Sequence, residues 1–105
     1  RPEWVAGSGN EWFWLDGEVL GVGCGVRAPD ARLVQIAEIV SIGYETDGHE
    51  LDMSLLDGSR VQGRLVRLGH LGEDAAGADA FVGELRARAK QLSPMYRMAL
   101  RRGRG

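Results

Sequence analysis

The chain has 105 residues and a mass of 11.4 kDa, which fits a single domain that buries about two thirds of its unfolded surface. Its one cysteine, Cys24, excludes an internal disulfide, and with only two histidines the chain falls short of a structural zinc site. The formal net charge of −2 conceals an asymmetry, because residues 1–85 hold all 15 acidic groups whereas residues 86–105 hold 7 basic groups and no acidic one.

The sequence also limits where the protein can work. No apolar stretch approaches the roughly 20 residues that a membrane span needs, and the first residues lack a signal-peptide pattern. The lone cysteine favours a reducing compartment, so we expect a cytoplasmic protein. Because the sequence starts at Arg1 and not at Met, we expect a piece of a longer, bacterial-type chain whose other parts could hold it at a membrane.

The N-terminal part of the chain alternates apolar residues with glycine-rich turns, which is typical of short antiparallel strands. The clearest turn is Asp16-Gly17, a dipeptide that favours a two-residue hairpin loop. This register places Trp14 opposite Val19 and Trp12 opposite Gly21, where a glycine gives an indole ring room to lie flat. The expected elements are a short strand at residues 4–6, a turn at residues 7–10, and strands at residues 11–15 and 18–26.

The pattern is less clear between residues 27 and 39. Pro29 and Asp30 indicate a turn at residues 27–30. Residues 31–39 could form a helical turn, but their β-branched content and the strands on both sides favour an extended conformation. Glu38 then marks a break before the next strand.

The most informative stretch is residues 41–68, where turn chemistry sets the register. If Asp47-Gly48 forms a two-residue type I′ turn, one face of the hairpin becomes apolar and the other polar. The apolar face then pairs Tyr44 with Leu51, Ile42 with Met53 and Val40 with Leu55, and the polar face pairs Ser41 with Ser54, Gly43 with Asp52 and Glu45 with Glu50.

The following turn requires a longer loop. A two-residue loop at Asp57-Gly58 would bring arginines onto the apolar face, so we reject it. A three-residue loop at residues 56–58, with Gly58 in the left-handed conformation, keeps the two faces separate. It pairs Met53 with Val61 and Leu51 with Gly63 on the apolar face, and Ser54 with Arg60, Asp52 with Gln62 and Glu50 with Arg64 on the polar face.

The C-terminal third predicts one helix. Residues 69–77 form a loop, and Asp74 or Asp79 can cap the helix that follows at residues 78–92. Ser93-Pro94 ends that helix, and residues 93–105 form a basic extension that is partly helical or frayed. The helix carries an apolar stripe of Phe81, Val82, Leu85, Ala89 and Leu92.

Together these elements predict a mainly β protein, an antiparallel meander of six to seven strands in a barrel or sandwich, capped by one C-terminal helix. Three segments, Ile-Ala-Glu-Ile-Val-Ser-Ile-Gly-Tyr at residues 36–44, Leu-Asp-Met-Ser-Leu-Leu-Asp-Gly at 51–58 and Ala-Phe-Val-Gly-Glu-Leu-Arg at 80–86, make the chain look like the small bacterial versions of the pleckstrin-homology-like (PH-like) fold.

This resemblance covers about residues 11–92. It implies a domain at residues 1–92, with seven strands in two near-orthogonal sheets, a helix in one open end, and a binding role without catalysis or a cofactor. Phosphoinositide-binding members carry basic residues in the loop between the first two strands. Neither residues 7–10 nor Asp16-Gly17 supplies one here, which argues against lipid binding at that place.

We therefore expect a non-catalytic protein-interaction or scaffolding module, because no paired carboxylates, catalytic triad or metal set is visible. Its partner would be another protein or another segment of the parent chain. Binding would use the tryptophans Trp4, Trp12 and Trp14, or an open sheet edge, and an edge strand also leaves a homodimer open.

The alternative from another class is a module for an anionic membrane surface or anionic ligand. It would use the strand arginines Arg60, Arg64 and Arg67 and the C-terminal Arg97, Arg101 and Arg102. The polar strand face has a simpler interpretation, in which its arginines pair with Glu50 and Asp52. Nucleic-acid binding is disfavoured, because the acidic body would repel a polyanion.

Overall fold

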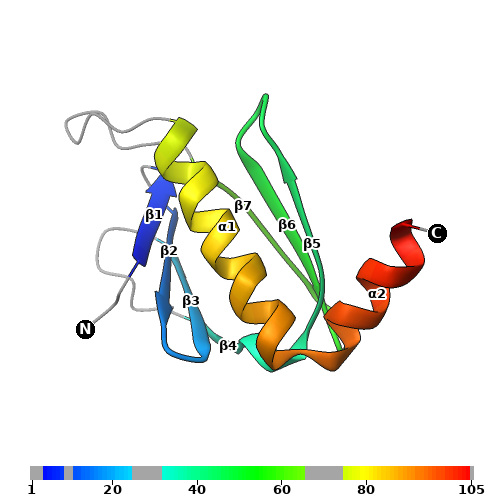
Figure 1. Ribbon diagram of the computed structural model, residues 1–105. Helices are drawn as coiled ribbons and strands as arrows, with labels where there is room; N and C mark the ends of the chain where they lie inside the picture. The colour runs from blue at the N-terminus through cyan, green and yellow to red at the C-terminus, as the bar shows by residue number, and fades with distance from the viewer. Residues whose placement is uncertain (1–3, 9–10, 25–31, 66–74, 105) are drawn as a thin grey trace.

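The protein is mainly β, with two antiparallel sheets followed by two helices (Figure 1). The computed structural model describes residues 4–8, 11–24, 32–65 and 75–104. One sheet has the order β1-β2-β3-β4 and the other the order β5-β6-β7, so each strand pairs with its neighbour in sequence. The elements are β1 (Trp4–Ser8), β2 (Glu11–Asp16), β3 (Val19–Cys24), β4 (Arg32–Gln35), the 3₁₀ turn η1 (Ile36–Glu38), β5 (Ile39–Glu45), β6 (Glu50–Leu55), β7 (Arg60–Arg64), α1 (Ala75–Leu92) and α2 (Pro94–Arg104).

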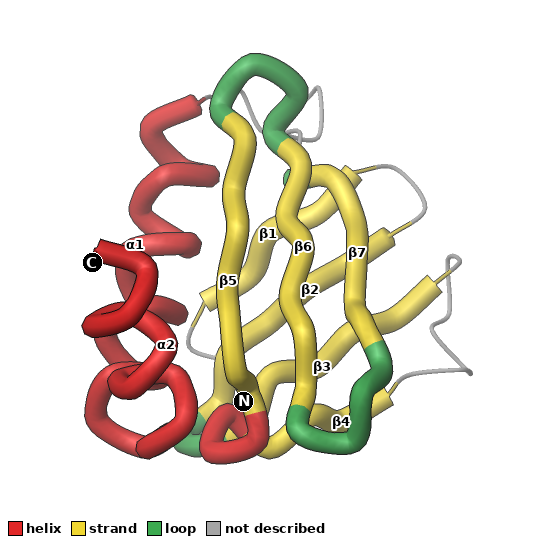
Figure 2. The backbone as a smooth tube through the Cα atoms, turned by 90° about the vertical axis from the view of Figure 1, so that its right-hand side faces the viewer, coloured by secondary structure: helices red, strands yellow, loops and turns green. Residues whose placement is uncertain are grey.

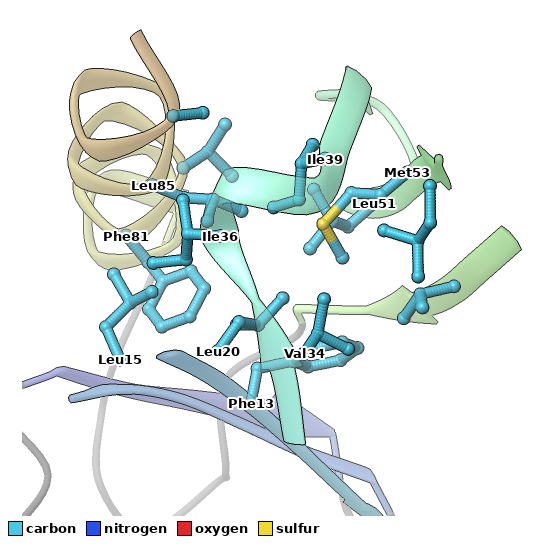
Figure 3. Close-up of a cluster of buried hydrophobic side chains, with 14 of the residues drawn as sticks. Phe13, Leu15, Leu20, Val34, Ile36, Ile39, Leu51, Met53, Phe81 and Leu85 are labelled. Carbon is cyan, nitrogen blue, oxygen red and sulfur yellow. The ribbon is translucent and has the colours of Figure 1, made fainter. Parts of the chain in front are cut away.

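The core lies between the two sheets, whose strands cross in Figure 2. Strand alternation supplies it, because Phe13 and Leu15 of β2 and every second residue of β6 are buried, while the residues between them are more exposed. Helix α1 closes the open side, where it contacts β1, η1 and β5. Figure 3 shows side chains from both sheets and the helix meeting in this core, among them Phe13, Leu15, Leu20, Val34, Ile36, Ile39, Leu51, Met53, Phe81 and Leu85.

The predicted register of the second sheet is confirmed for most of its length. Ile42 pairs with Met53 and Tyr44 with Leu51. The loop at residues 56–58 has three residues, and Gly58 has a positive φ of 89°, which glycine adopts without steric cost. All five predicted pairs between β6 and β7 are present, from Ser54 with Arg60 to Glu50 with Arg64.

Two details of the first hairpin in that sheet were predicted wrongly. Asp47-Gly48 is not a type I′ turn, since the left-handed residue is His49, with φ 54°, inside a four-residue connection. The register survives because Glu45 still pairs with Glu50. A β-bulge between Ile39 and Ser41 lets Ile39, and not Val40, oppose Leu55.

In the first sheet, the register of the β2–β3 hairpin was also predicted wrongly. The two central loop residues are Gly17 and Glu18, with Gly17 at φ 61°, so Asp16 pairs with Val19 and Trp14 with Gly21. This differs from the prediction by two residues, an even shift that leaves every side chain on its expected face.

Residues 31–39 are not one strand. Strand β4 ends at Gln35, and the chain turns through η1 before β5 begins at Ile39, which matches the break expected at Glu38. The turn forms because buried Ile36 is drawn into the core while its amide donates to the Glu18 carbonyl at 3.0 Å. The turn expected at residues 27–30, the loop at 69–74 and the cap Asp74 lie outside the described residues.

The C-terminal region differs most from expectation, because it contains two helices and not one. Helix α1 starts at Ala75, earlier than predicted, which places Asp79 inside the helix and rules it out as an N-cap. The expected break at Ser93-Pro94 is confirmed, and of the two alternatives for the extension, partly helical or frayed, the helical one holds, because residues 94–104 form a second helix. The two sheets are hydrogen-bonded separately, so the described strands do not close into a barrel.

Candidate functional site

Helix α2 is fixed to β5 and α1 by a buried serine. The side chain of Ser93 is fully buried, its hydroxyl donates to the Ile39 carbonyl at 2.5 Å, and it accepts the Tyr96 amide at 3.1 Å. Ser93 is thus an N-cap for α2, and Pro94 takes the first helical position, where the missing amide hydrogen has no cost. The direction of α2 is therefore set by contacts to the strand as well as to α1.

An arginine ties the two helices together from the other side. Arg97 in the first turn of α2 donates to the Lys90 carbonyl at 2.7 Å and the Gln91 carbonyl at 3.2 Å, at the end of α1. These carbonyls have no partner within the helix, and a cation also suits the negative end of the helix dipole. Arg97, a candidate ligand-binding residue in the sequence, thus has a structural role.

This arrangement creates a groove of about 440 Å³ between β5, α1 and α2. Its apolar lining comes from Ile42, Ala87, Tyr96 and Leu100, and its cationic groups are Arg86 and Lys90. Gly83 widens it, since a Cβ at this position would meet nothing within 4 Å. Its volume is similar to the volumes of three hollows on the outer face of the second sheet, so what distinguishes the groove is its lining and not its size.

The cations of the groove are held in different ways. Arg86 reaches the Ile42 carbonyl on β5 at 3.5 Å. Burial raises the pKa of the Tyr96 hydroxyl, while the charge and hydrogen bond of Arg86 act in the opposite direction. Lys90 is exposed. By contrast, Arg88 does not line the groove. It donates to the Glu84 carboxylate at 2.8 Å and to the Gly17 carbonyl at 2.9 Å.

A second polar cluster lies at the far end of the β5–β6 hairpin. The Tyr44 hydroxyl is 3.1 Å from Nδ1 of His49, which gives this half-buried turn residue a side-chain partner. The Tyr44 pKa is raised by burial first, and then by the charge of Asp79 and a hydrogen bond to it. The cluster therefore joins the hairpin tip to α1.

The outer face of the second sheet is polar, as predicted. Arg60 forms an ion pair with Asp52, and the hydroxyls of Ser41 and Ser54 are hydrogen-bonded to each other. Three hollows of about 480, 420 and 440 Å³ lie on this face and share Asp52. The positive charge of Arg60 is thus offset by a neighbouring carboxylate, as in the simpler interpretation of this face.

The strand register separates the positions of Trp4 and Trp14 in the first sheet. Trp4 is paired with Leu15, whose side chain is in the core, whereas Trp14 is on the opposite face with Gly21. The indole of Trp14 lies directly over Gly21, so the expected glycine–indole packing occurs with a different partner. On the neighbouring strand β4, Leu33 pairs with Gly21, and its side chain is 66% exposed.

The structure thus separates the candidate residues into distinct surfaces. Arg60 and Arg64 are on the second sheet, Arg101 and Arg102 are exposed on α2, and Arg67 is outside the described residues. Positions 12 and 14 are two residues apart in β2, so they fall on the same side of the strand. The groove was not predicted because no full second helix was expected, although the spacing of Tyr96 and Leu100 by four residues is a signal for one.

The comparisons with known proteins gave no further identification: no family model, curated protein or solved structure matches the chain. Within the described ranges, no helix is long and apolar enough to cross a membrane. Among the same residues, no group of three or more histidine, cysteine, aspartate or glutamate side chains is placed to hold a metal ion.

Proposed function

We propose that this domain is a non-catalytic protein-interaction module, and that the groove between β5, α1 and α2 receives a short peptide segment of a partner protein or of another part of the same parent chain. The partner segment would carry apolar side chains and at least one carboxylate. The observation that carries the proposal is the combination in one groove of an apolar lining with the cations Arg86 and Lys90.

The architecture supports this role. Seven antiparallel strands in two sheets, followed by helices, agree in part with what the PH-like resemblance implies, and this resemblance implies binding without catalysis. The groove also lies against β5, an edge strand of its sheet. Its Ile42 carbonyl is contacted by Arg86 from α1 and not by a further strand, so a bound segment would meet a strand edge as well as side chains.

The chemistry of the groove predicts its specificity. Apolar side chains of a ligand would displace water from Ile42, Tyr96 and Leu100, which is the favourable contribution. A ligand carboxylate near Arg86 or Lys90 would add a charge-assisted hydrogen bond, whereas a ligand cation would be repelled. Peptides that combine acidic and apolar residues should therefore bind better than peptides of equal apolarity with lysine in place of the acids.

The test is fluorescence polarisation with a panel of labelled ten-residue peptides in which apolar residues alternate with Asp or Glu. The matched panel replaces the acids by Lys. The substitution Gly83→Leu fills the groove at a helix position with open space, so it should abolish binding without unfolding the domain.

The control is Gly103→Leu, the same change at another α-helical glycine that has open space around it and does not line the groove. Selective binding of acidic panel members that Gly83→Leu removes and Gly103→Leu preserves would support the proposal. Equal binding of both panels, or equal binding by the two variants, would refute it.

A further inference from the structure

Helix α2 presents a second surface on the side that does not line the groove. Met95, Met98 and Arg102 follow the spacing i, i+3, i+7 and so share one side of the helix, and Arg101 is the i+3 neighbour of Met98. Met95 is 42% exposed and Met98 44% exposed, and both arginines are exposed. Figure 1 shows α2 at the opposite end of the molecule from β1. We call these four residues the α2 outer face.

The two sides of α2 are chemically distinct. Tyr96 is 3% exposed and packs into the core, and Arg97 is engaged by the carbonyls at the end of α1. Within the described part of the chain, Arg101 and Arg102 form no ion pair. The outer face therefore has two flexible apolar side chains beside two cations that pair with none of the carboxylates the structure describes.

We infer that the α2 outer face docks the domain on an anionic lipid bilayer, a function separate from the proposed peptide groove. An interfacial amphipathic helix needs apolar side chains that enter the headgroup region and arginines that stay at the lipid phosphates, and both are present here on one helix. Methionine suits this role because its unbranched side chain adapts to an irregular surface.

Charge complementarity favours a bilayer over a second copy of the chain. The helix that carries the surface, α2, contains four arginines and no acidic residue, so this end of the molecule attracts an extended anionic surface. A second copy would offer a mixed surface with a formal net charge of only −2, whereas an anionic bilayer presents one sign of charge over its whole area.

The experiment is co-sedimentation of the full 105-residue chain with vesicles of phosphatidylcholine alone and with about 30% phosphatidylserine. We expect binding to the anionic vesicles only, reduced by added salt because exposed charges are screened. Each cation near an anionic leaflet contributes about fivefold in affinity, so Arg101→Gln with Arg102→Gln should weaken binding about 30-fold. Met95→Ser with Met98→Ser should also weaken binding, at unchanged net charge.

The matched control is Arg32→Gln with Arg60→Gln, which removes the same charge from exposed positions on the two sheets and should weaken binding less than about threefold. Circular dichroism checks that each variant is folded. No binding to anionic vesicles would overturn the inference, as would equal losses in the two arginine variants. A dimer in light scattering that the methionine variant dissociates would assign the surface to a second copy and would also overturn it.

Discussion

Ser93 is the residue whose loss should disturb the groove without touching its lining. In Ser93→Ala the N-cap of α2 is lost, which costs about 1 kcal/mol, and so is the hydrogen bond to the buried Ile39 carbonyl, which contributes about 1 kcal/mol more. The free energy of unfolding should therefore fall by about 2 kcal/mol. For a domain of this size, that corresponds to a decrease in Tm of roughly 10 °C.

Urea denaturation followed by circular dichroism measures this change, and hydrogen exchange at residues 94–104 shows whether α2 opens separately. The matched control is Ser41→Ala, which removes an exposed hydroxyl hydrogen-bonded to Ser54 and should alter stability by less than about 0.5 kcal/mol. If Ser93→Ala is as stable as the wild type and α2 exchanges at the wild-type rate, the assignment of Ser93 as the residue that anchors α2 is wrong.

Three further predictions follow from the strands and their turns. Gly21→Ala should destabilise the domain by about 1–3 kcal/mol in thermal denaturation, because its methyl group would overlap the Trp14 indole; an unchanged Tm would contradict the packing described here. Gly58→Ala should cost about 1 kcal/mol because φ is 89°, whereas Gly48→Ala, outside the left-handed region, should cost less, and the reverse order would refute the assigned loop geometry. The raised pKa of Tyr44 favours its protonated form in the folded state, so its contribution to the free energy of unfolding should be fully present below pH 10 and be lost as the pH rises through the folded pKa. Urea denaturation at a series of pH values should show a smaller decline for Tyr44→Phe than for the wild type, and an equal decline would contradict this role.

The sequence was sufficient for the second sheet because its signals are local. Alternating apolar residues left only one register that kept arginine out of the core, and Gly58 supplied the left-handed residue that the three-residue loop requires. Even where the turn type was wrong, at Asp47-Gly48, the pairing of Glu45 with Glu50 survived, since the buried face and not the turn determines which residues must face one another.

The β2–β3 hairpin shows where local signals fail. Both candidate registers place Trp14 on the same face, because they differ by two residues, so hydrophobic alternation cannot choose between them. The observed register puts Gly21 under the Trp14 indole, a contact between side chain and neighbouring strand that requires the assembled sheet.

The candidate site depends still more on the assembled fold. Residue spacing alone could have indicated a helix at residues 94–104, but not that Ser93 would cap it against the Ile39 carbonyl, 54 residues earlier in the chain. The groove combines side chains from β5, α1 and α2, and it exists only because those elements are packed together. No periodicity within one segment contains that information.

The amino-acid sequence alone thus determined the mainly antiparallel architecture, the polar and apolar faces of the second sheet, and the basic C-terminal end. Each of these follows from residues close together in the chain. Tertiary structure decided which cations are engaged and which are exposed, since Arg97 binds the end of α1 whereas Arg101 faces outward on the next turn of the same helix. The physical reason is that the availability of a charged side chain depends on the carbonyls and carboxylates that folding brings within hydrogen-bonding distance, and most of those come from distant parts of the chain.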